Sequence, residues 1–297
     1  MPKLSCFALS LLTVTVMSTA LPVWARDPFR TAKARSIPAE TATAFDTLFR
    51  DGNFQGSLPQ IERAIKANDS EPLAHTMGAL VAFFRQDLNG MRQSGRLVKQ
   101  RAQALLSKDK LRGHTYLAIA DLIESAYLFK TEGISSVPRV LPLIQNVLDE
   151  MKNAQRIDPT DPELNLLKGL MDILISSVST AVIPSTDVEA SLTNLRQFSA
   201  PDYLKWGGIA VAYRDAKKTT LAMEAVDKAL ASAPNNPVLS YFKGQIFWVK
   251  GDIPEARRYY LLTLSKAAQL PDQFIKDVLA ECIRMTGKAS ECQVSSP

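Results

Sequence analysis

The chain contains few of the residues on which metal and acid–base chemistry depend. Its 297 residues include two histidines, His75 and His114, and three cysteines, and no C-x-x-C pair or H-E-x-x-H motif occurs. Each histidine lies close to a glycine of a helical pattern, so we expect both to pack on or between helices. G-x-S-x-G, the P-loop and G-x-G-x-x-G are also missing. We therefore expect a protein with no catalytic site, no metal ion and no cofactor.

Glycine is scarce as well, at 13 residues beside 17 prolines, and no long run alternates β-branched with polar residues. These counts exclude a collagen-like chain, and three cysteines exclude a disulfide-dense scaffold. With 46% hydrophobic and 22% charged residues, the bulk of the chain is not disordered. A net charge of +5 is too small at this length to indicate nucleic-acid binding. Apolar residues recur at helical spacing almost throughout, which predicts an all-α fold.

The first 25 residues have the three-part layout of a secretory signal. Lys3 precedes an apolar stretch from Phe7 to Met17, and a small-residue exit ends at Ala25. The stretch is shorter than the ~20 residues that span a bilayer. We predict that residues 1–25 are a cleaved signal peptide, that residues 26–37 form a flexible mature N-terminus, and that the protein is periplasmic. A thylakoid-lumen or extracellular location, and anchoring by an uncleaved signal, are the alternatives.

Cleavage would remove Cys6 and leave Cys282 and Cys292. Two remaining thiols can pair in the oxidising compartment that an exported protein enters. A bridge between them would tie the C-terminal tail, residues 288–297, to the last helix, and a loop this short contributes about 2–3 kcal/mol. Two free thiols are the alternative.

Two neighbouring segments share one helical pattern at a spacing of 34 residues. The positions of the first copy are Trp206, Ile209, Ala210, Tyr213, Ala222, Val226, Ala229 and Pro234. In the second copy Gly244, Phe247, Ala256 and Tyr260 take the places of Ala210, Tyr213, Ala222 and Val226. Small residues allow two helices to cross closely, and large residues fill the space beside the crossing. This pattern resembles the tetratricopeptide repeat, with conservative replacements at its signature positions.

Looser copies of the pattern extend upstream. The segment Leu164–Gly169 copies Leu239–Gly244, and each follows a proline. The resemblance implies an α-solenoid of stacked antiparallel helix pairs over residues 38–287, with about six pairs. The best repeats are 203–236 and 237–270, and a capping helix is expected from Asp272 to Thr286. Interruptions around 131–143 and 179–187 are expected to be insertions. In overall arrangement the chain also looks like a family of secreted tetratricopeptide proteins from cyanobacteria.

The resemblance also implies a function, because tetratricopeptide proteins usually hold a peptide against the first helices of their pairs. Carried over to the two best repeats, this gives a partner-binding groove formed by Val211, Arg214, Tyr241, Gln245 and Trp248. The positions that correspond to the basic and amide residues of the Lys/Asn clamp subtype are Gly207, Val211, Tyr241 and Gln245, so capture of a C-terminal carboxylate is not expected. The alternative for the two aromatic residues is internal packing. We expect a non-catalytic, exported scaffold or adaptor for a protein or peptide partner.

Three features leave other interpretations open. Basic residues are concentrated in the range 92–112, and no aromatic residues are interleaved with them, so base stacking is not indicated. We expect a solvated helix face. The alternative is an envelope-associated assembly factor that contacts a membrane or anionic partner through this face. The range 164–183 is apolar nearly all round except for Lys168 and Asp172, so it is either buried or self-associates. The acidic turn at 158–163 lacks the central glycine of a calcium loop and is expected to cap the next helix. An enzyme with carboxylates from distant helices is the remaining alternative.

Overall fold

The computed structural model describes residues 27–177 and 188–293 of the chain. Within these two ranges the chain forms helices and connecting turns and contains no strand, so the all-α prediction is confirmed. The expected signal peptide at 1–25 and the expected insertion at 179–187 lie outside the described residues. No helix of the described ranges combines the length and the apolar character needed to span a membrane.

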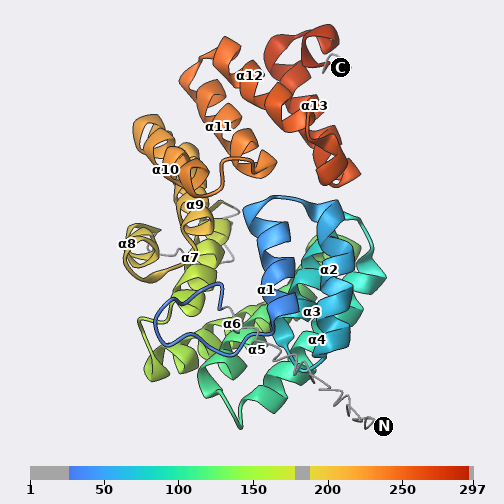
Figure 1. Cartoon of the computed structure of the whole chain (residues 1–297), viewed down its shortest axis with the longest axis vertical. Coiled ribbons are helices and arrows are strands. Elements are labelled where there is room, and N and C mark those ends of the chain that lie inside the picture. Colours follow the sequence, from blue (N-terminus) through green and yellow to red (C-terminus); the bar gives the residue numbers. More distant parts are fainter. Residues whose placement is uncertain (1–26, 178–187, 294–297) are drawn as a thin grey trace, which may run out of the picture.

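The described helices pack as six successive pairs followed by a single helix (Figure 1). The first helices of the pairs are α1 (Ala39–Phe45, continued by the π-helical turn η1, Asp46–Arg50), α3 (Pro72–Phe84), α5 (Lys110–Glu132), α7 (Pro162–Ser177), α9 (Asp202–Asp215) and α11 (Pro237–Lys250). The second helices are α2 (Phe54–Ala67), α4 (Leu88–Leu105), α6 (Val137–Ile157), α8 (Val188–Phe198), α10 (Thr219–Ser232) and α12 (Ile253–Leu264). The capping helix α13 (Asp272–Thr286) has the predicted bounds, and the predicted solenoid of about six pairs is confirmed.

Small residues lie where the two helices of a pair cross, as the repeat pattern predicts. A Cβ atom at Gly244 on α11 would come within 3.3 Å of Tyr259 Cβ and 3.4 Å of the Ala256 carbonyl on α12. In the preceding pair, Ala210 on α9 and Ala222 on α10 are both completely buried. The close crossing brings the neighbouring large side chains into one continuous core, which is how repeats that cannot bury their own apolar faces become stable.

The extra residues expected around 131–143 lie there, but they extend two helices instead of forming a separate insertion. Helix α5 continues to Glu132, and α6 begins at Val137 after a short 3-10 turn, Gly133–Ser136. Gly133 adopts φ +59°, which glycine tolerates without strain. Pro138 lies in the first turn of α6, where a missing N–H costs no helical hydrogen bond. The extra residues therefore lengthen α5 and α6 to 23 and 21 residues.

The segment 26–37 was expected to be flexible, but its described residues, 27–37, pack on the solenoid and are here called the N-terminal strap. Phe29 and Ile37 are buried, and the Phe29 ring lies 5.1 Å from the ring of Phe45 on α1. The Asp27 carboxylate accepts hydrogen bonds from the backbone N–H groups of Phe29 (2.8 Å) and Arg35 (3.0 Å). Burial of two apolar side chains and these local bonds offset the entropy of ordering the segment.

Residues 288–293 fold back on α13. Cys282 Sγ is bonded to Cys292 Sγ, which joins α13 to the short 3-10 turn Ala289–Cys292. Both cysteines are buried in a cluster with Tyr260 and Val278. The structure thus contains the bridge that was expected from two thiols in an oxidising compartment.

The array curves until its first pair meets its last. Asn236, at the start of α11, donates hydrogen bonds from Nδ2 to the backbone carbonyls of Phe49 (2.8 Å) and Arg50 (3.1 Å). Gln55 Nε2 on α2 donates to the carbonyl of Leu270, at 3.4 Å. Figure 1 shows α1 and α2 (blue) beside the near ends of α11 and α13. We call these hydrogen bonds the closing contact.

Replacing Asn236 by alanine is expected to lower the free energy of unfolding by about 2–3 kcal/mol. The substitution removes the side-chain oxygen that accepts from the backbone N–H groups of Val238 and Leu239, and also the donor to the carbonyls of Phe49 and Arg50 in η1. Asn236→Asp keeps the capping oxygen and loses the donor, so it should show an intermediate loss. Urea denaturation followed by circular dichroism measures all three proteins. Asn235→Ala, at the exposed neighbouring position, is the control, and an equal effect there would contradict the assignment.

Candidate functional site

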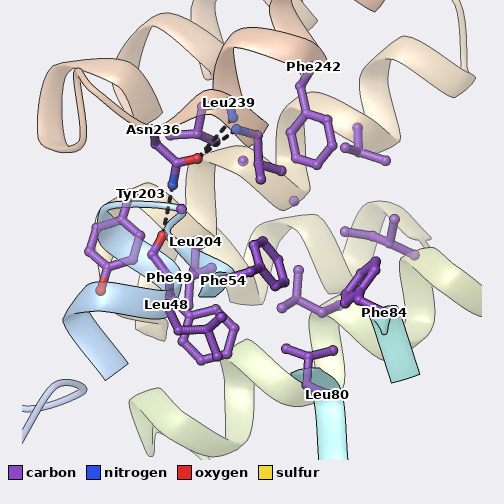
Figure 2. Close-up of a pocket in the computed structure, with 17 residues that line it drawn as sticks. Leu48, Phe49, Phe54, Leu80, Phe84, Tyr203, Leu204, Asn236, Leu239 and Phe242 are labelled. Carbon is purple, nitrogen blue, oxygen red and sulfur yellow. Dashed lines mark hydrogen bonds between the residues drawn. The ribbon is translucent and has the colours of Figure 1, made fainter. Parts of the chain in front are cut away.

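A cavity of about 520 Å³ lies between the first pair and the first helices of later pairs (Figure 2). Apart from the first pair, each lining helix is the first of its pair: α3, α7, α9 and α11. The apolar side chains around it are Leu48, Phe49, Phe54, Leu80, Phe84, Leu170, Ile173, Leu204, Val211, Val238, Leu239 and Phe242. The cavity exists because the closing contact brings η1 and α2 against α9 and α11.

The walls of this cavity offer almost no polar group. Among the described residues that line it, Asn236 and Tyr203 alone have polar side chains, and none is charged. Every hydrogen-bonding group of the Asn236 side chain is engaged: Oδ1 caps α11, and Nδ2 holds the carbonyls of Phe49 and Arg50. Figure 2 shows the hydroxyl of Tyr203 pointing away from the other labelled side chains. The cavity can therefore accept apolar groups and has little to offer a polar one.

The structure separates the five residues of the predicted groove into three places. Val211 lines the cavity. Arg214, Tyr241 and Gln245 come together beyond it: Arg214 Nη1 donates to Gln245 Oε1, and Gln245 Nε2 donates to Tyr241 Oη at 2.7 Å. Trp248 is half-buried against the C-terminal core cluster.

Glu281 of the capping helix, which was not among the predicted groove residues, joins this polar group. Its carboxylate accepts from Gln245 Nε2 at 3.0 Å and from Tyr260 Oη at 3.0 Å. Tyr241 is buried, with ring centroids 5.7 Å from Tyr260 and 5.1 Å from Phe274. The internal packing considered for Tyr241 is thus what the structure shows. Glu281 lies on the capping helix, outside the two best repeats, so repeat positions alone gave no reason to select it.

Burial raises the pKa of Tyr241 and Tyr260, and the nearby charge of Glu281 raises both further. Burial also raises the pKa of Tyr116, whose hydroxyl donates to Glu163. Since the folded-state pKa values lie above the ordinary tyrosine pKa of about 10, these groups stabilise the fold below that pH. The stabilisation is lost as the pH rises through the folded-state values.

We expect these three tyrosines to ionise only as the protein unfolds in alkali. An alkaline titration should follow phenolate absorbance and helical circular dichroism in the same sample. The last phenolates should appear together with the loss of helix, and Tyr260→Phe should remove one of them. Complete ionisation of all seven tyrosines with the helices intact would contradict this expectation.

A second cluster of polar groups lies where α3, α5 and α7 begin, and we call it the buried charge network. Arg112 on α5 donates to both oxygens of Glu71 (2.7 and 3.2 Å) and to Glu163 (3.2 Å). Arg35 of the strap donates to Glu163 at 2.7 Å and to Asp161 at 2.5 Å. Arg30 also pairs with Asp161. Burial raises the pKa of Glu163, and the charges of Arg112 and Arg35 offset this only in part.

The network is built on helix caps. Glu71 accepts from the backbone N–H of Leu73 at the start of α3, and Asp161 accepts from that of Leu164 at the start of α7. The prediction that the acidic turn caps the next helix is confirmed. The carboxylates are neutralised by arginines, and the described residues contain no group of three or more His, Cys, Asp or Glu arranged to hold a metal ion. These contacts give the network a structural role.

Most of the basic run at 92–112 is paired within the chain. Arg92 bonds to Glu124 (3.2 Å), Lys99 to Asp121 (2.8 Å), and Arg101 to Asp69. Arg112 is buried in the charge network. Internal pairing reduces the positive field that this run could offer a membrane or another anionic partner.

The remaining residues singled out in the sequence have local partners. His75 Nε2 lies 2.9 Å from the carbonyl of Asp69, and His114 Nδ1 lies 2.6 Å from Glu150 Oε2. Lys168 and Asp172 pair on α7 at 2.6 Å, as their spacing suggested. On α7, Leu164, Leu166, Met171 and Ile173 are buried against other parts of the chain. The apolar range 164–183 is therefore packed inside the protein as far as Ile173.

The paired helices and their small-residue crossings define an α-solenoid of helical repeats. Residues 208–271 match the family model described as Tetratricopeptide repeat, which covers the end of α9 and all of α10, α11 and α12. The chain therefore carries tetratricopeptide repeats, and the prediction from the two best copies is confirmed. Repeats of this kind generally serve as scaffolds for protein interaction.

Among solved structures, the chain is similar to the crystal structure of a thermophilic TPR protein in Thermus thermophilus. The two are 17% identical, and the match covers 84% of this chain and 98% of that chain. The TM-score of 0.32 is too low to carry an argument about shared geometry. No curated protein matches the chain.

Proposed function

We propose that the protein is an exported, non-catalytic scaffold that binds a protein or peptide partner on the side of the solenoid formed by the first helices. The observation that carries this proposal is the apolar cavity, which is lined by first helices of four pairs in addition to the opening pair. Tetratricopeptide repeats at 208–271 support it, because such repeats are generally interaction scaffolds. The signal-like segment at 1–25 supports export to the periplasm.

Two neighbouring surfaces would contact the partner. Val211 lines the cavity, and Arg214, one helical turn further along α9, belongs to the polar group with Gln245 and Glu281. A partner that places an apolar side chain at the cavity could therefore reach arginine, amide and carboxylate groups beside it. Buried apolar anchors next to polar contacts are typical of protein interfaces.

Capture of a partner from an envelope extract tests this function. The tagged mature protein is the bait, and captured proteins are identified by mass spectrometry. Val211→Asp places a charge in the cavity wall and should abolish recovery of a specific partner. Val249→Asp, at a position of α11 that is 45% exposed, is the matched control and should capture normally. Circular dichroism checks that both variants are folded. Equal recovery with both variants would overturn the proposed binding surface.

A further inference from the structure

The cavity is a half-open hollow with an almost wholly apolar lining. At about 520 Å³ the cavity lies within the ~300–1,000 Å³ typical of small-molecule sites. Several lining side chains are only partly buried in the structure, among them Leu80, Phe84 and Phe242. An apolar occupant would bury them fully, and this is the main source of affinity in such sites.

The lining also restricts what the occupant can be. A peptide backbone placed inside would lose hydrogen bonds to water and find none in return, because both polar ends of the Asn236 side chain are engaged. The backbone N–H and C=O groups of the lining helices are engaged in hydrogen bonds within the helices. A helix satisfies its own backbone, but it is about 10 Å across, and the cavity would hold little more than one turn of it. The occupant should therefore be flexible, narrow and free of hydrogen-bonding groups.

We propose that the cavity binds one alkyl chain of a monoacyl amphiphile. This inference goes beyond the proposed binding of a protein partner: it concerns the cavity that also carries that proposal, and it is tested by a separate measurement. Among the described residues that line the cavity none carries a charge, so a polar head group stays outside in solvent. Binding should therefore depend on the length of the chain and be insensitive to the charge of its head.

Fluorescence of a pyrene-labelled hexadecanoic acid, mixed with the mature protein, provides the direct test. Octanoate, dodecanoate and hexadecanoate compete below their micelle concentrations. Affinity should rise about fourfold for each added methylene until the cavity is full. Hexadecyltrimethylammonium should compete as well as hexadecanoate, despite its opposite charge. A strong preference for one head-group charge would overturn the proposal.

Two variants with matched controls place the site. Val211→Trp fills the cavity and should weaken binding about tenfold or more, whereas Val249→Trp should leave it unchanged. Leu204→Gln puts a polar group of similar size into the wall and should also weaken binding, with Leu262→Gln, 43% exposed, as its control. The Leu204 pair keeps the test valid if the tryptophan variant does not fold.

Further results would also overturn the inference. One is the absence of probe binding, or equal binding by the cavity variants and their controls. The other is displacement of the probe by an apolar peptide when the alkyl amphiphiles fail to displace it, which would assign the cavity to the protein partner instead. Capture from the envelope extract is measured separately, so failure of alkyl binding can be distinguished from failure of the scaffold function.

Discussion

Replacing Arg112 by alanine should lower the free energy of unfolding by about 3–5 kcal/mol, because it breaks a buried ion pair by removing one partner. Arg112 forms an ion pair with Glu71, and the two side chains are 5% and 7% exposed. Glu163 keeps Arg35 as a partner after the substitution, whereas Glu71 loses its bidentate guanidinium. Urea denaturation of the mature protein measures the loss.

Two companion variants separate charge from packing. Arg112→Met keeps much of the side-chain volume and should destabilise nearly as strongly, because Glu71 is still left without a cation. Adding Glu71→Gln to Arg112→Met should recover part of the stability. Arg258→Ala, which removes the exposed partner of Glu255, should have little effect. A small loss for Arg112→Ala would show that water reaches Glu71 and that the pair contributes little.

The double substitution Arg30→Ala with Arg35→Ala should release the N-terminal strap from the solenoid. Both arginines pair with Asp161, whose side chain is completely buried beneath them. With the strap in place and both cations removed, Asp161 would be a buried unpaired charge, at a cost of about 3–5 kcal/mol. Detachment of the strap relieves this cost by admitting water. The expected loss of stability is therefore limited by the free energy with which the strap docks.

Limited proteolysis and urea denaturation together measure this effect. In the double variant the strap should be cut rapidly near Phe29, and the midpoint of unfolding should fall. Lys33→Ala, an exposed position on the same strap, should change neither property. Continued protection of the strap in the double variant would show that burial of Phe29 and Ile37 holds it without the arginines.

The repeated helix pairs could be predicted from the sequence because their signal is local. The 34-residue spacing of Ala210 with Gly244 and of Ala222 with Ala256 places small residues at the helix crossings, and the helical period sets the bounds nearby. The capping helix from Asp272 to Thr286 was predicted for the same reason. Around 131–143, glycine and proline suggested a break, but they occupy a short turn and a first helical turn, which accept them.

The strap and the cavity could not be predicted because both depend on contacts between distant segments. Arg30 meets Asp161 across 131 residues of sequence, and nothing near Arg30 indicates that pairing. The cavity forms where η1 and α2 meet α9 and α11, so it depends on the curvature of the whole array. Repeat positions did select Val211, which lines the cavity, but they grouped it with Trp248, which packs elsewhere.

The contact of Asn236 with Phe49 and Arg50 also bears on how the chain unfolds. In an open repeat array each unit is supported by its sequence neighbours alone, so terminal units fray and the array can unfold from one end. Here the opening pair is also a neighbour of the sixth, across 187 residues. Loss of contacts in the first pair should therefore also destabilise the sixth pair, and loss of contacts in the sixth pair should destabilise the first. The array should lose its structure in a single cooperative transition, and it should tolerate loss of a terminal repeat less well than an open solenoid does.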